Sequence, residues 1–427
     1  MHGIWFALIH IFHAYSIRQV DIKRKILCKG DKWAILTSEE RHRARDQRRR
    51  LKREAKRREK MGRYDNFKNV TDYNNLLKAY RDAKKGISWK TSVQRYGMEL
   101  TANICRIHNK LENEESTIMG FIPFDVMERG KLRHIMSIHF KERVAQKCLS
   151  QNVLTPILSN SLIFDNGACR KGMGISHTIN RLERHLHEYY RKHGREGYVL
   201  KIDLKNYFAS IPHDKLKEMY MKHITDEKAL RLTFGYVDSF ADYKRAHGDE
   251  DAAVGLGLGS EINQISAVAY PDPIDHWIKE VKRCRWYARY NDDSYIIHHS
   301  KEFLKGLLSE IREKYRELGI KLSEKKTKIV KLSRGFTFLK TKFSITNTGR
   351  VIKRICRKSI TTIRRKLKKF AKFLAKGEMS FNDIRSSYQS WKGYAGHMNS
   401  FKTVRNMDRL FNALFINNYL KEVPSNG

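Results

Sequence analysis

Two β-prone segments with acidic residues at their ends constrain this chain more than any other feature. The first segment, residues 197–208 (GYVLKIDLKNYF), reads as a buried strand over 198–202 that ends at Asp203. The second, residues 286–297 (WYARYNDDSYII), has apolar and aromatic runs on both sides of the tripeptide 291–293, Asn-Asp-Asp. Because Asn and Asp favour turns, we expect a tight hairpin that carries paired carboxylates at its tip.

Paired carboxylates between apolar strands repel each other unless a cation lies beside them. We expect Asp203 to join Asp292 and Asp293 in an all-oxygen site suited to two Mg²⁺ ions, with Mn²⁺ as a substitute. Two such ions about 3.5–4 Å apart serve in-line phosphoryl transfer between nucleotides. The alternative is a solvated turn without an ion. The flanking strands and the third carboxylate favour the metal site.

The chain carries a large excess of positive charge. Lys and Arg total 86 against 46 Asp and Glu, which gives a formal net charge of +40. An excess of this size is typical of proteins that neutralise phosphates, and a small-molecule enzyme has no use for it. With 41% hydrophobic and 11% aromatic residues, the chain is not disordered as a whole. We therefore expect a nucleic acid as the main partner.

The cysteines and the N-terminus predict a cytoplasmic protein without a membrane partner. The six cysteines are scattered and form no close pair, which argues against CxxC-type zinc sites and dense disulfide frameworks. The N-terminal apolar run, residues 4–17, is shorter than the roughly 20 residues that span a bilayer. It also lacks the basic flank and the cleavage site of a signal peptide.

Two segments concentrate the basic residues. Residues 41–60 hold 12 basic and 3 acidic residues with almost no apolar stripe, which fits a solvated arm or an arm that folds along nucleic-acid phosphates. Met61 follows directly, and a second hypothesis is that translation starts there, with residues 1–60 as an upstream extension. Residues 351–376 hold 11 basic and no acidic residues, yet Ile363 and Leu367 belong to an apolar stripe at helical spacing.

Five motifs, which include the two segments above, carry a family resemblance through their order along the chain. YVLKIDLKNYFASIPH, GLGLGSEINQ, YARYNDDSYII, LSEKKTKIV and GFTFLKTKF resemble the motif series of reverse transcriptases. The resemblance is greatest to the bacterial, non-viral branch, which includes group II introns, retrons, diversity-generating retroelements and defence-associated enzymes. Upstream, GKLRHI, FKERVAQ and NGACRKGMGISHTINRLERHL resemble the fingers motifs of that branch. The resemblance covers roughly residues 70–420.

The resemblance implies an α+β, right-hand polymerase fold. Its palm would be an antiparallel sheet with helices behind it. The implied domains are a basic N-terminal extension over 1–65, fingers and first palm elements over 66–195, a palm with the YNDD motif over 196–345, and a helical thumb with C-terminal helices over 346–427.

The resemblance also implies roles for single residues. Asp203 and Asp292 match the principal metal ligands, and Asp293 matches the third acidic residue. Phe208 matches a steric gate, whose ring would collide with a ribose 2′-hydroxyl and so select deoxynucleotides.

Several residues match positions that hold the incoming nucleotide. Gln264 matches the glutamine near the nucleotide, and Lys326 matches a lysine that contacts the leaving phosphates. Arg170 and Lys171 are the expected fingers cations for the triphosphate, with Arg181 as an alternative.

Two groups of residues match contacts with the duplex. The first would form a primer grip: Gly335, Phe336, Phe338 and Leu339. The second would bind nucleic-acid phosphates from the thumb: Arg364, Arg365, Lys368 and Lys369.

The implied function is an RNA-directed DNA polymerase that adds dNTPs to a primer 3′-hydroxyl on an RNA template. The primer would be DNA or RNA, and a dedicated structured RNA or an accessory protein would assist. A diversity-generating or antiviral-defence retroelement is the expected source. Two alternatives stay open: a non-catalytic RNA-binding maturase or chaperone, and a template-independent or protein-primed DNA polymerase. Asn291, Asn263 and Lys340 depart from the usual family pattern and leave the subfamily open.

Overall fold

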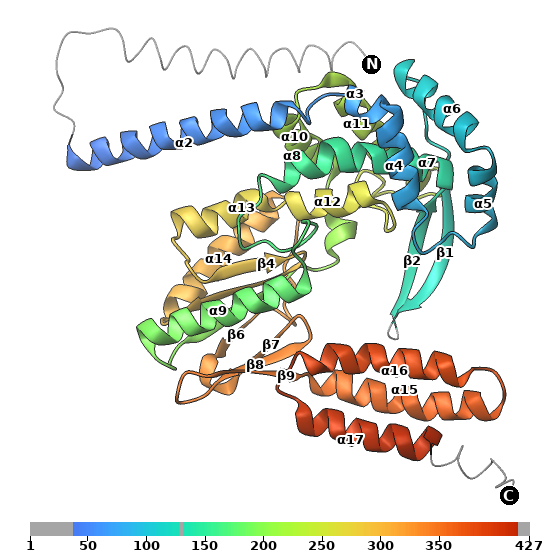
Figure 1. Cartoon of the computed structure of the whole chain (residues 1–427). Coiled ribbons are helices and arrows are strands. Elements are labelled where there is room, and N and C mark those ends of the chain that lie inside the picture. The colour runs from blue at the N-terminus through green and yellow to red at the C-terminus, as the bar shows by residue number, and fades with distance from the viewer. Residues whose placement is uncertain (1–36, 129–130, 417–427) are drawn as a thin grey trace, which may run out of the picture. The chain divides into compact units, whose positions relative to one another are not determined.

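The computed structural model describes residues 37–128 and 131–416, and Figure 1 labels its elements. The chain divides into two compact units, with the boundary between Lys60 and Met61. Helices and antiparallel sheets build the second unit, so the protein belongs to the α+β class. In the part of the chain that the structure describes, no helix is long and apolar enough to cross a membrane.

Helix α2, Ser38–Gly62, is a strongly basic helix of 25 residues. It begins in a reciprocal cap. The Glu40 N–H donates to Thr37 Oγ1 over 3.2 Å, and the Thr37 N–H donates to Glu40 Oε2 over 2.8 Å. Between residues 37 and 60 the described side chains are exposed, apart from the half-buried Ala44. The basic segment is therefore a capped helix that is polar on all sides.

Helices and one hairpin form the chain from residue 68 to residue 159. The hairpin pairs β1, Phe121–Glu128, with β2, Lys131–Ile138. The apolar faces of the helices enter the largest core of the molecule. These helices are α3 (Lys68–Thr71), α4 (Tyr73–Ala83), α5 (Thr91–Met98), α6 (Leu100–Glu112), α7 (Phe140–Leu149), the π-helix Ser150–Leu154 and α8 (Thr155–Ser159).

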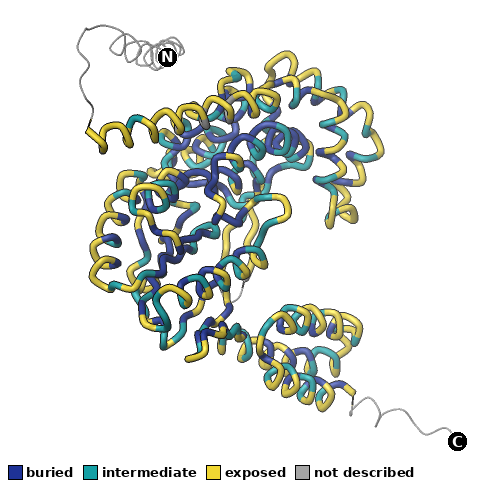
Figure 2. Tube along the Cα trace, turned by 60° about the vertical axis from the view of Figure 1, so that its left-hand side comes forward, coloured by how far each residue is buried: buried dark blue, intermediate teal, exposed yellow. Residues whose placement is uncertain are grey.

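A four-stranded antiparallel sheet in the order β4-β5-β3-β6 forms the centre of the second unit (Figure 1). Successive residues of a strand point to opposite faces. Leu200 of β3 therefore enters the largest core, and Val199 enters a second core under α9. Buried residues accordingly follow the sheet strands in Figure 2. The strands are β3 (Tyr198–Asp203), β4 (Tyr287–Tyr290), β5 (Asp293–His298) and β6 (Lys328–Lys331).

Helices cover both faces of this central sheet. Helix α9 packs Leu182, Leu186 and Tyr189 into the second core. Helices α12 and α14 contribute Ile265 and Leu304 to the largest core on the other face. The helices are α9 (Ile175–His193), α10 (His213–His223), α11 (Glu227–Ala246), α12 (Glu261–Ala269), α13 (Asp272–His276) and α14 (Lys301–Glu317).

A second antiparallel sheet, β7-β8-β9, leads into a C-terminal bundle of helices α15, α16 and α17 (Figure 1). Ile363, Leu367 and Phe370 of α15 are buried in the core of the bundle, which confirms the apolar stripe predicted from their spacing. The basic residues of α15 remain outside. The elements are β7 (Phe336–Phe338), β8 (Thr341–Ile345), β9 (Val351–Ile355), α15 (Arg357–Ala375), α16 (Phe381–Gly396) and α17 (Phe401–Phe411).

Candidate active site

The central sheet brings the acidic segments together. Strand β3 pairs with β5 so that Asp203, the last residue of β3, is the direct partner of Asp293, the first residue of β5. Directly opposed residues of antiparallel strands have Cβ atoms about 4.5–5.5 Å apart. Asp292 precedes Asp293 in the turn. Three carboxylates from segments about 90 residues apart therefore lie together at one end of the two central strands.

The turn between β4 and β5 has two central residues, because Tyr290 pairs with Asp293. Asn291, the first of these two residues, has a φ of 53°. Asparagine accepts this left-handed conformation more readily than most residues. The expected hairpin is thus confirmed, with Asp292 in the turn and Asp293 already in the strand.

The carboxylates lie in a partly buried and electrostatically unfavourable environment. Burial, followed by the charges of Asp292 and Asp203, raises the pKa of Asp293 to about 6. Burial also raises the pKa of Asp292, and the Asp203 charge adds to the shift. Lys201, on β3, lies near this cluster; burial lowers its pKa although Asp293 and Asp203 oppose the shift. The cluster therefore favours a nearby cation.

Lys326 supplies one such cation in this structure. Its Nζ donates to both carboxylate oxygens of Asp203, over 2.9 and 2.8 Å. This hydrogen bonding raises the pKa of Lys326. The next residue, Thr327, has its hydroxyl near the backbone of Asp203 and accepts the Asp203 N–H over 3.3 Å. The Ser323 N–H donates to the Asp203 carbonyl over 2.8 Å. The loop before β6 thus holds Asp203 from several sides.

The donor set suits divalent cations, although its present geometry does not form a finished metal site. Within residues 37–128 and 131–416, no three His, Cys, Asp or Glu side chains are arranged to hold an ion as they stand. Asp203 instead directs both oxygens to Lys326. The available ligands are carboxylate oxygens, which are the ligands that Mg²⁺ and Mn²⁺ prefer. Burial and the neighbouring carboxylates raise the pKa of Asp293, so a cation beside it would be stabilising. The residues therefore fit the expected metal.

Phe208 lies five residues after Asp203, in a 3₁₀ turn over Tyr207–Ser210. Its side chain is half-buried, and its carbonyl accepts the Leu256 N–H over 2.7 Å. The buried hydroxyl of Tyr207 donates to the Ala267 carbonyl of α12. These contacts hold the backbone at Phe208 and leave part of its ring accessible.

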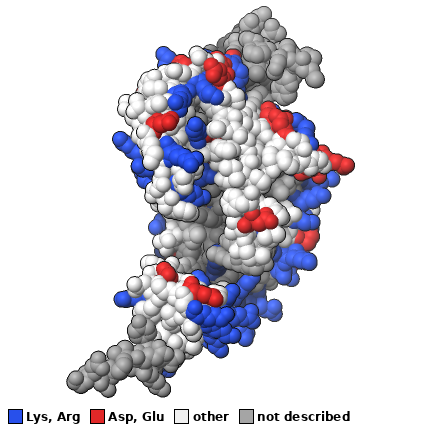
Figure 3. Space-filling model, turned by 90° about the vertical axis from the view of Figure 1, so that its right-hand side faces the viewer, with Lys and Arg blue, Asp and Glu red and all other residues white. Residues whose placement is uncertain are grey.

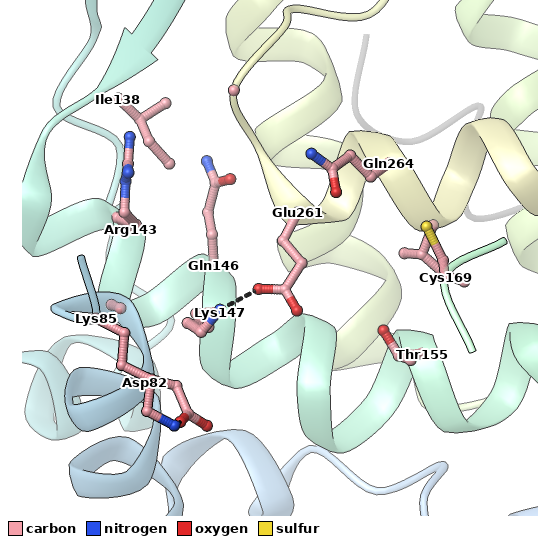
Figure 4. Close-up of a pocket in the computed structure, with 13 residues that line it drawn as sticks. Asp82, Lys85, Ile138, Arg143, Gln146, Lys147, Thr155, Cys169, Glu261 and Gln264 are labelled. Atoms are coloured by element: carbon pink, nitrogen blue, oxygen red, sulfur yellow. Dashed lines mark hydrogen bonds and ion pairs between the residues drawn. The ribbon is translucent and has the colours of Figure 1, made fainter. Parts of the chain in front are cut away.

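Gln264 is an exposed residue of α12 that lines a cavity of about 440 Å³ (Figure 4). Arg143 of α7 lies on the other side of the cavity in that view, and Lys147 forms an ion pair of 2.6 Å with Glu261 beside it. Arg143 is half-buried, donates to Ser137 Oγ over 3.2 Å, and has its pKa lowered by burial.

The expected triphosphate cations are not among the residues that line this cavity, although Cys169, next to Arg170, is. The Arg170 guanidinium donates to the carbonyls of Ile163 and Asn166 over 3.1 and 3.3 Å, so its hydrogen bonds support a loop. The alternative, Arg181, forms an ion pair with the buried Asp165. Lys171 is exposed. The structure instead places Arg143 and Lys147 in the cavity with Gln264. The only sequence signal for Arg143 is its place in the FKERVAQ motif.

The expected primer grip is the hairpin of β7 and β8. Phe336 and Phe338 are buried, and their rings pack against Phe343 and Tyr295. Their side chains therefore support the hairpin from inside. Its turn contains Leu339 and Lys340, with φ values of 44° and 62°. At the base of the hairpin, Gly335 has a φ of 68°, and an added Cβ would lie 2.6 Å from the Phe343 carbonyl oxygen.

The expected thumb cations lie on the outer surface of α15. Figure 3 shows Lys and Arg side chains gathered over one side of the C-terminal bundle. The four predicted residues of α15 are all exposed: Arg364, Arg365, Lys368 and Lys369. The opposite face of the same helix is the buried apolar stripe. One helix thus combines packing with a continuous cationic surface.

Slightly more than half of the chain matches a known protein family. Residues 123–343 match the family described as "Reverse transcriptase (RNA-dependent DNA polymerase)". No curated protein matches the chain. Among solved structures, an apo telomerase from Candida tropicalis truncated from its C-terminal domain is 15% identical, with a TM-score of 0.40 over 55% of this chain and 54% of that one. A second apo telomerase from the same organism is 14% identical, with a TM-score of 0.41 over 58% and 53%. The chain spans a little over half the length of both.

Proposed function

The chain belongs to the reverse transcriptase family, and we propose that it is an RNA-directed DNA polymerase that extends a primer 3′-hydroxyl with dNTPs at the Asp203, Asp292 and Asp293 cluster. The observation that carries this proposal is the pairing of Asp203 with Asp293 beside the turn that contains Asp292. The pairing gathers three carboxylates where the sequence of the family expects metal ligands. The partners are an RNA template, a DNA or RNA primer, and dNTPs.

Two Mg²⁺ ions would be held by these three carboxylates, and Mn²⁺ would substitute. When bound, the ions would lower the pKa of the primer hydroxyl and neutralise charge on the transferred phosphate and the leaving pyrophosphate. The chain's own residues do the rest of the work. Strands β3 and β5 hold the carboxylates in fixed register, and Thr327 and Ser323 hold the backbone of Asp203.

The incoming nucleotide would lie between the carboxylate cluster and the cavity with Gln264. Phe208 would exclude a ribose 2′-hydroxyl by contact with its ring. Arg143, half-buried and hydrogen-bonded to the hydroxyl of Ser137, is better placed than Arg170 to meet nucleotide phosphates. Lys326 would leave Asp203 for the leaving phosphates when an ion takes its place.

The right-hand domains follow from this placement of the site. The central sheet of residues 196–345 would be the palm, residues 66–195 would be the fingers, and residues 346–427 would form the thumb, whose α15 surface binds duplex phosphates. Helix α2, within the N-terminal extension 1–65, is basic and capped before any ligand binds. It would bind a structured RNA, because arginine-rich helices neutralise phosphates and release counterions.

The biological setting that we propose is a cytoplasmic, bacterial retroelement of the diversity-generating or antiviral-defence type. A dedicated structured RNA or an accessory protein would supply the template or the primer. The support for this setting is the resemblance of the motifs to the bacterial, non-viral branch of the family. Sequencing the RNA and cDNA that co-purify with the protein tests it directly. A single RNA species paired with complementary cDNA would support it.

Primer extension tests the polymerase proposal. The full chain is incubated with a primed RNA of defined sequence, dNTPs and Mg²⁺, and the products are sequenced. We expect extension that copies the template, loss of activity in EDTA, and recovery in Mg²⁺ or Mn²⁺. Products that ignore the template would support an untemplated or protein-primed polymerase, and RNA binding without any extension would support a maturase or chaperone.

A further inference from the structure

Arg289 is a fully buried arginine two residues before the catalytic turn. It lies in β4, with 1% of its side chain exposed. Its partner Asp275, on α13, is 0% exposed. Taking two charges out of water is costly, and their attraction compensates only when the geometry is good and the remaining protons are satisfied. The cost of burying this pair therefore depends on the hydrogen bonds that the guanidinium makes.

The guanidinium contacts three separate elements. Nε donates to both oxygens of Asp275 over 2.9 Å, and Nη2 donates to Asp275 Oδ2 over 2.6 Å. Nη1 donates to the carbonyl of Asn291 in the turn over 3.1 Å. Nη2 also donates to the carbonyl of Val268, in α12, over 2.8 Å.

The backbone at Arg289 is held as firmly as its side chain. Its N–H donates to the Asp165 carbonyl over 3.2 Å, and its carbonyl accepts the Gly167 N–H over 3.4 Å. Asp275, in turn, accepts the hydroxyl of the buried Tyr287. These contacts fix the position of the guanidinium. Its hydrogen bond to the Asn291 carbonyl therefore restrains the turn.

The elements joined by Arg289 are the ones that the proposed reaction needs. The Asn291 carbonyl belongs to the turn in which Asn291 has a φ of 53°, and the next residues are Asp292 and Asp293. The Val268 carbonyl belongs to α12, the helix that carries Gln264. One planar side chain thus connects the carboxylates with the wall of the nucleotide cavity.

We propose that Arg289, oriented by Asp275, is a positioning residue that sets the conformation of the catalytic turn and its spacing from α12. This inference rests on the proposed function. Arginine suits the role because its guanidinium is a rigid fork with several donors in one plane. Lysine at this position would keep the buried charge pair, but its single ammonium would not reach Asp275, Asn291 and Val268 in the same geometry.

The test uses two variants that are designed to fold. Arg289→Lys keeps a positive charge beside Asp275. The triple variant Arg289→Met/Asp275→Leu/Tyr287→Phe replaces the buried polar cluster with apolar groups of similar size, a change that is often neutral for stability. The control is Lys217→Met/Asp238→Leu, which removes an ion pair of 2.5 Å between α10 and α11.

Thermal unfolding and RNA binding are measured first, followed by kcat, the dNTP KM and the Mg²⁺ requirement. We expect both Arg289 variants to fold and bind RNA, with kcat lowered about 10- to 100-fold, since a displacement near 1 Å at a reacting centre costs about that much. We also expect the Mg²⁺ concentration that gives half of the Mg²⁺-induced rise in Tm, measured without nucleic acid, to increase about 10-fold. The control should match the wild type in all of these measurements.

The outcomes separate this inference from the proposed function. If wild-type protein extends primers and both folded Arg289 variants keep kcat and Mg²⁺ affinity within about two-fold of wild type, the positioning role is wrong and the polymerase assignment stands. If both variants fail to fold, the role is also wrong, because Arg289 then holds the fold as a whole. If wild-type protein extends no primer, the proposed function is what fails; an unchanged Mg²⁺ affinity in the folded variants would still overturn the positioning role, and a weakened one would support it.

Discussion

Asp203 and Asp293 face each other across two antiparallel strands, at the point where β3 ends and β5 begins. This pairing does not stabilise the sheet, because like charges directly opposite each other on antiparallel strands are destabilising. Burial is the main cause of the raised pKa of Asp293, and the charges of Asp292 and Asp203 raise it further. A cation bound between the two carboxylates would relieve this repulsion.

Removing the two carboxylates of the turn should abolish catalysis and leave RNA binding intact. For Asp292→Ala/Asp293→Ala we expect dNTP incorporation to fall by at least about 10³-fold, because no ligand set for the two ions remains. RNA affinity should stay within about two-fold, since cations rather than these carboxylates bind phosphates. Single-turnover primer extension and filter binding measure the two effects. Asp249→Ala/Glu250→Ala, an exposed pair of acids between α11 and α12, is the control and should stay fully active. Normal activity in the double variant at 292 and 293 would disprove the assignment.

The stability of the metal-free protein should depend on pH through Asp293. Its pKa of about 6 in the folded chain lies above the unfolded value of 3.8. The folded state thus binds the proton more tightly, and this stabilising contribution is complete below about pH 3.8 and lost as the pH rises through about 6. In EDTA, the Tm of Asp293→Asn minus that of wild type should therefore increase by about 2–5 °C from pH 4 to pH 7.

Mg²⁺ should reverse this effect at neutral pH. At pH 7.5, above its pKa of about 6, Asp293 is ionised and able to bind the ion, so Mg²⁺ should raise the Tm of the wild type and have little effect on Asp293→Asn. Differential scanning fluorimetry in EDTA and in Mg²⁺ gives both comparisons. If the Tm in EDTA depended on pH identically in wild type and in Asp293→Asn, the pKa of Asp293 would not be raised in the folded protein.

Phe208→Ala should relax the selection of the sugar. With the ring removed, a ribose 2′-hydroxyl no longer meets a steric barrier, so we expect the ratio of kcat/KM for dNTP over NTP to fall at least about 10-fold. The kcat/KM for dNTP should change less than the kcat/KM for NTP. Phe401→Ala, which shortens an exposed phenylalanine of α17, is the control and should leave the ratio unchanged. An unchanged ratio in Phe208→Ala would argue against the gate.

Neutralising charges on α15 should weaken duplex binding without slowing the chemical step. For Arg364→Gln/Lys368→Gln, two exposed residues one helical turn apart, we expect the slope of log Kobs against log salt to become shallower by about 1–2. Single-turnover rates at saturating protein should remain at the wild-type value. Lys301→Gln/Lys305→Gln removes two charges at the same spacing from α14 and should not alter the slope. Equal slopes in all three proteins would place the duplex elsewhere.

The sequence was most informative where a local pattern is enough. The strand that ends at Asp203, the Asn-Asp turn before Asp293 and the stripe of Ile363 and Leu367 all follow from spacing within one element, and the structure has each of them. The charge of +40 predicted a nucleic-acid partner. The order of the motifs predicted the reverse transcriptase family, which the family match confirms.

Tertiary structure decided which charged side chains face the site. Arg170, which the sequence predicted to bind the triphosphate, donates to the carbonyls of its own loop. Arg143 lines the cavity with Gln264. Local sequence could not separate the two, because the direction of a long side chain depends on the elements packed around it. The same holds for Lys326, whose ammonium reaches Asp203 from 123 positions away, and for Arg289. A buried guanidinium needs partners for all its protons, and only the packing of β4 against α12 and α13 provides them. The sequence by itself thus determined which residues are able to do chemistry, and the fold decided which of them meet, because charges act over a few ångströms of space rather than along the chain.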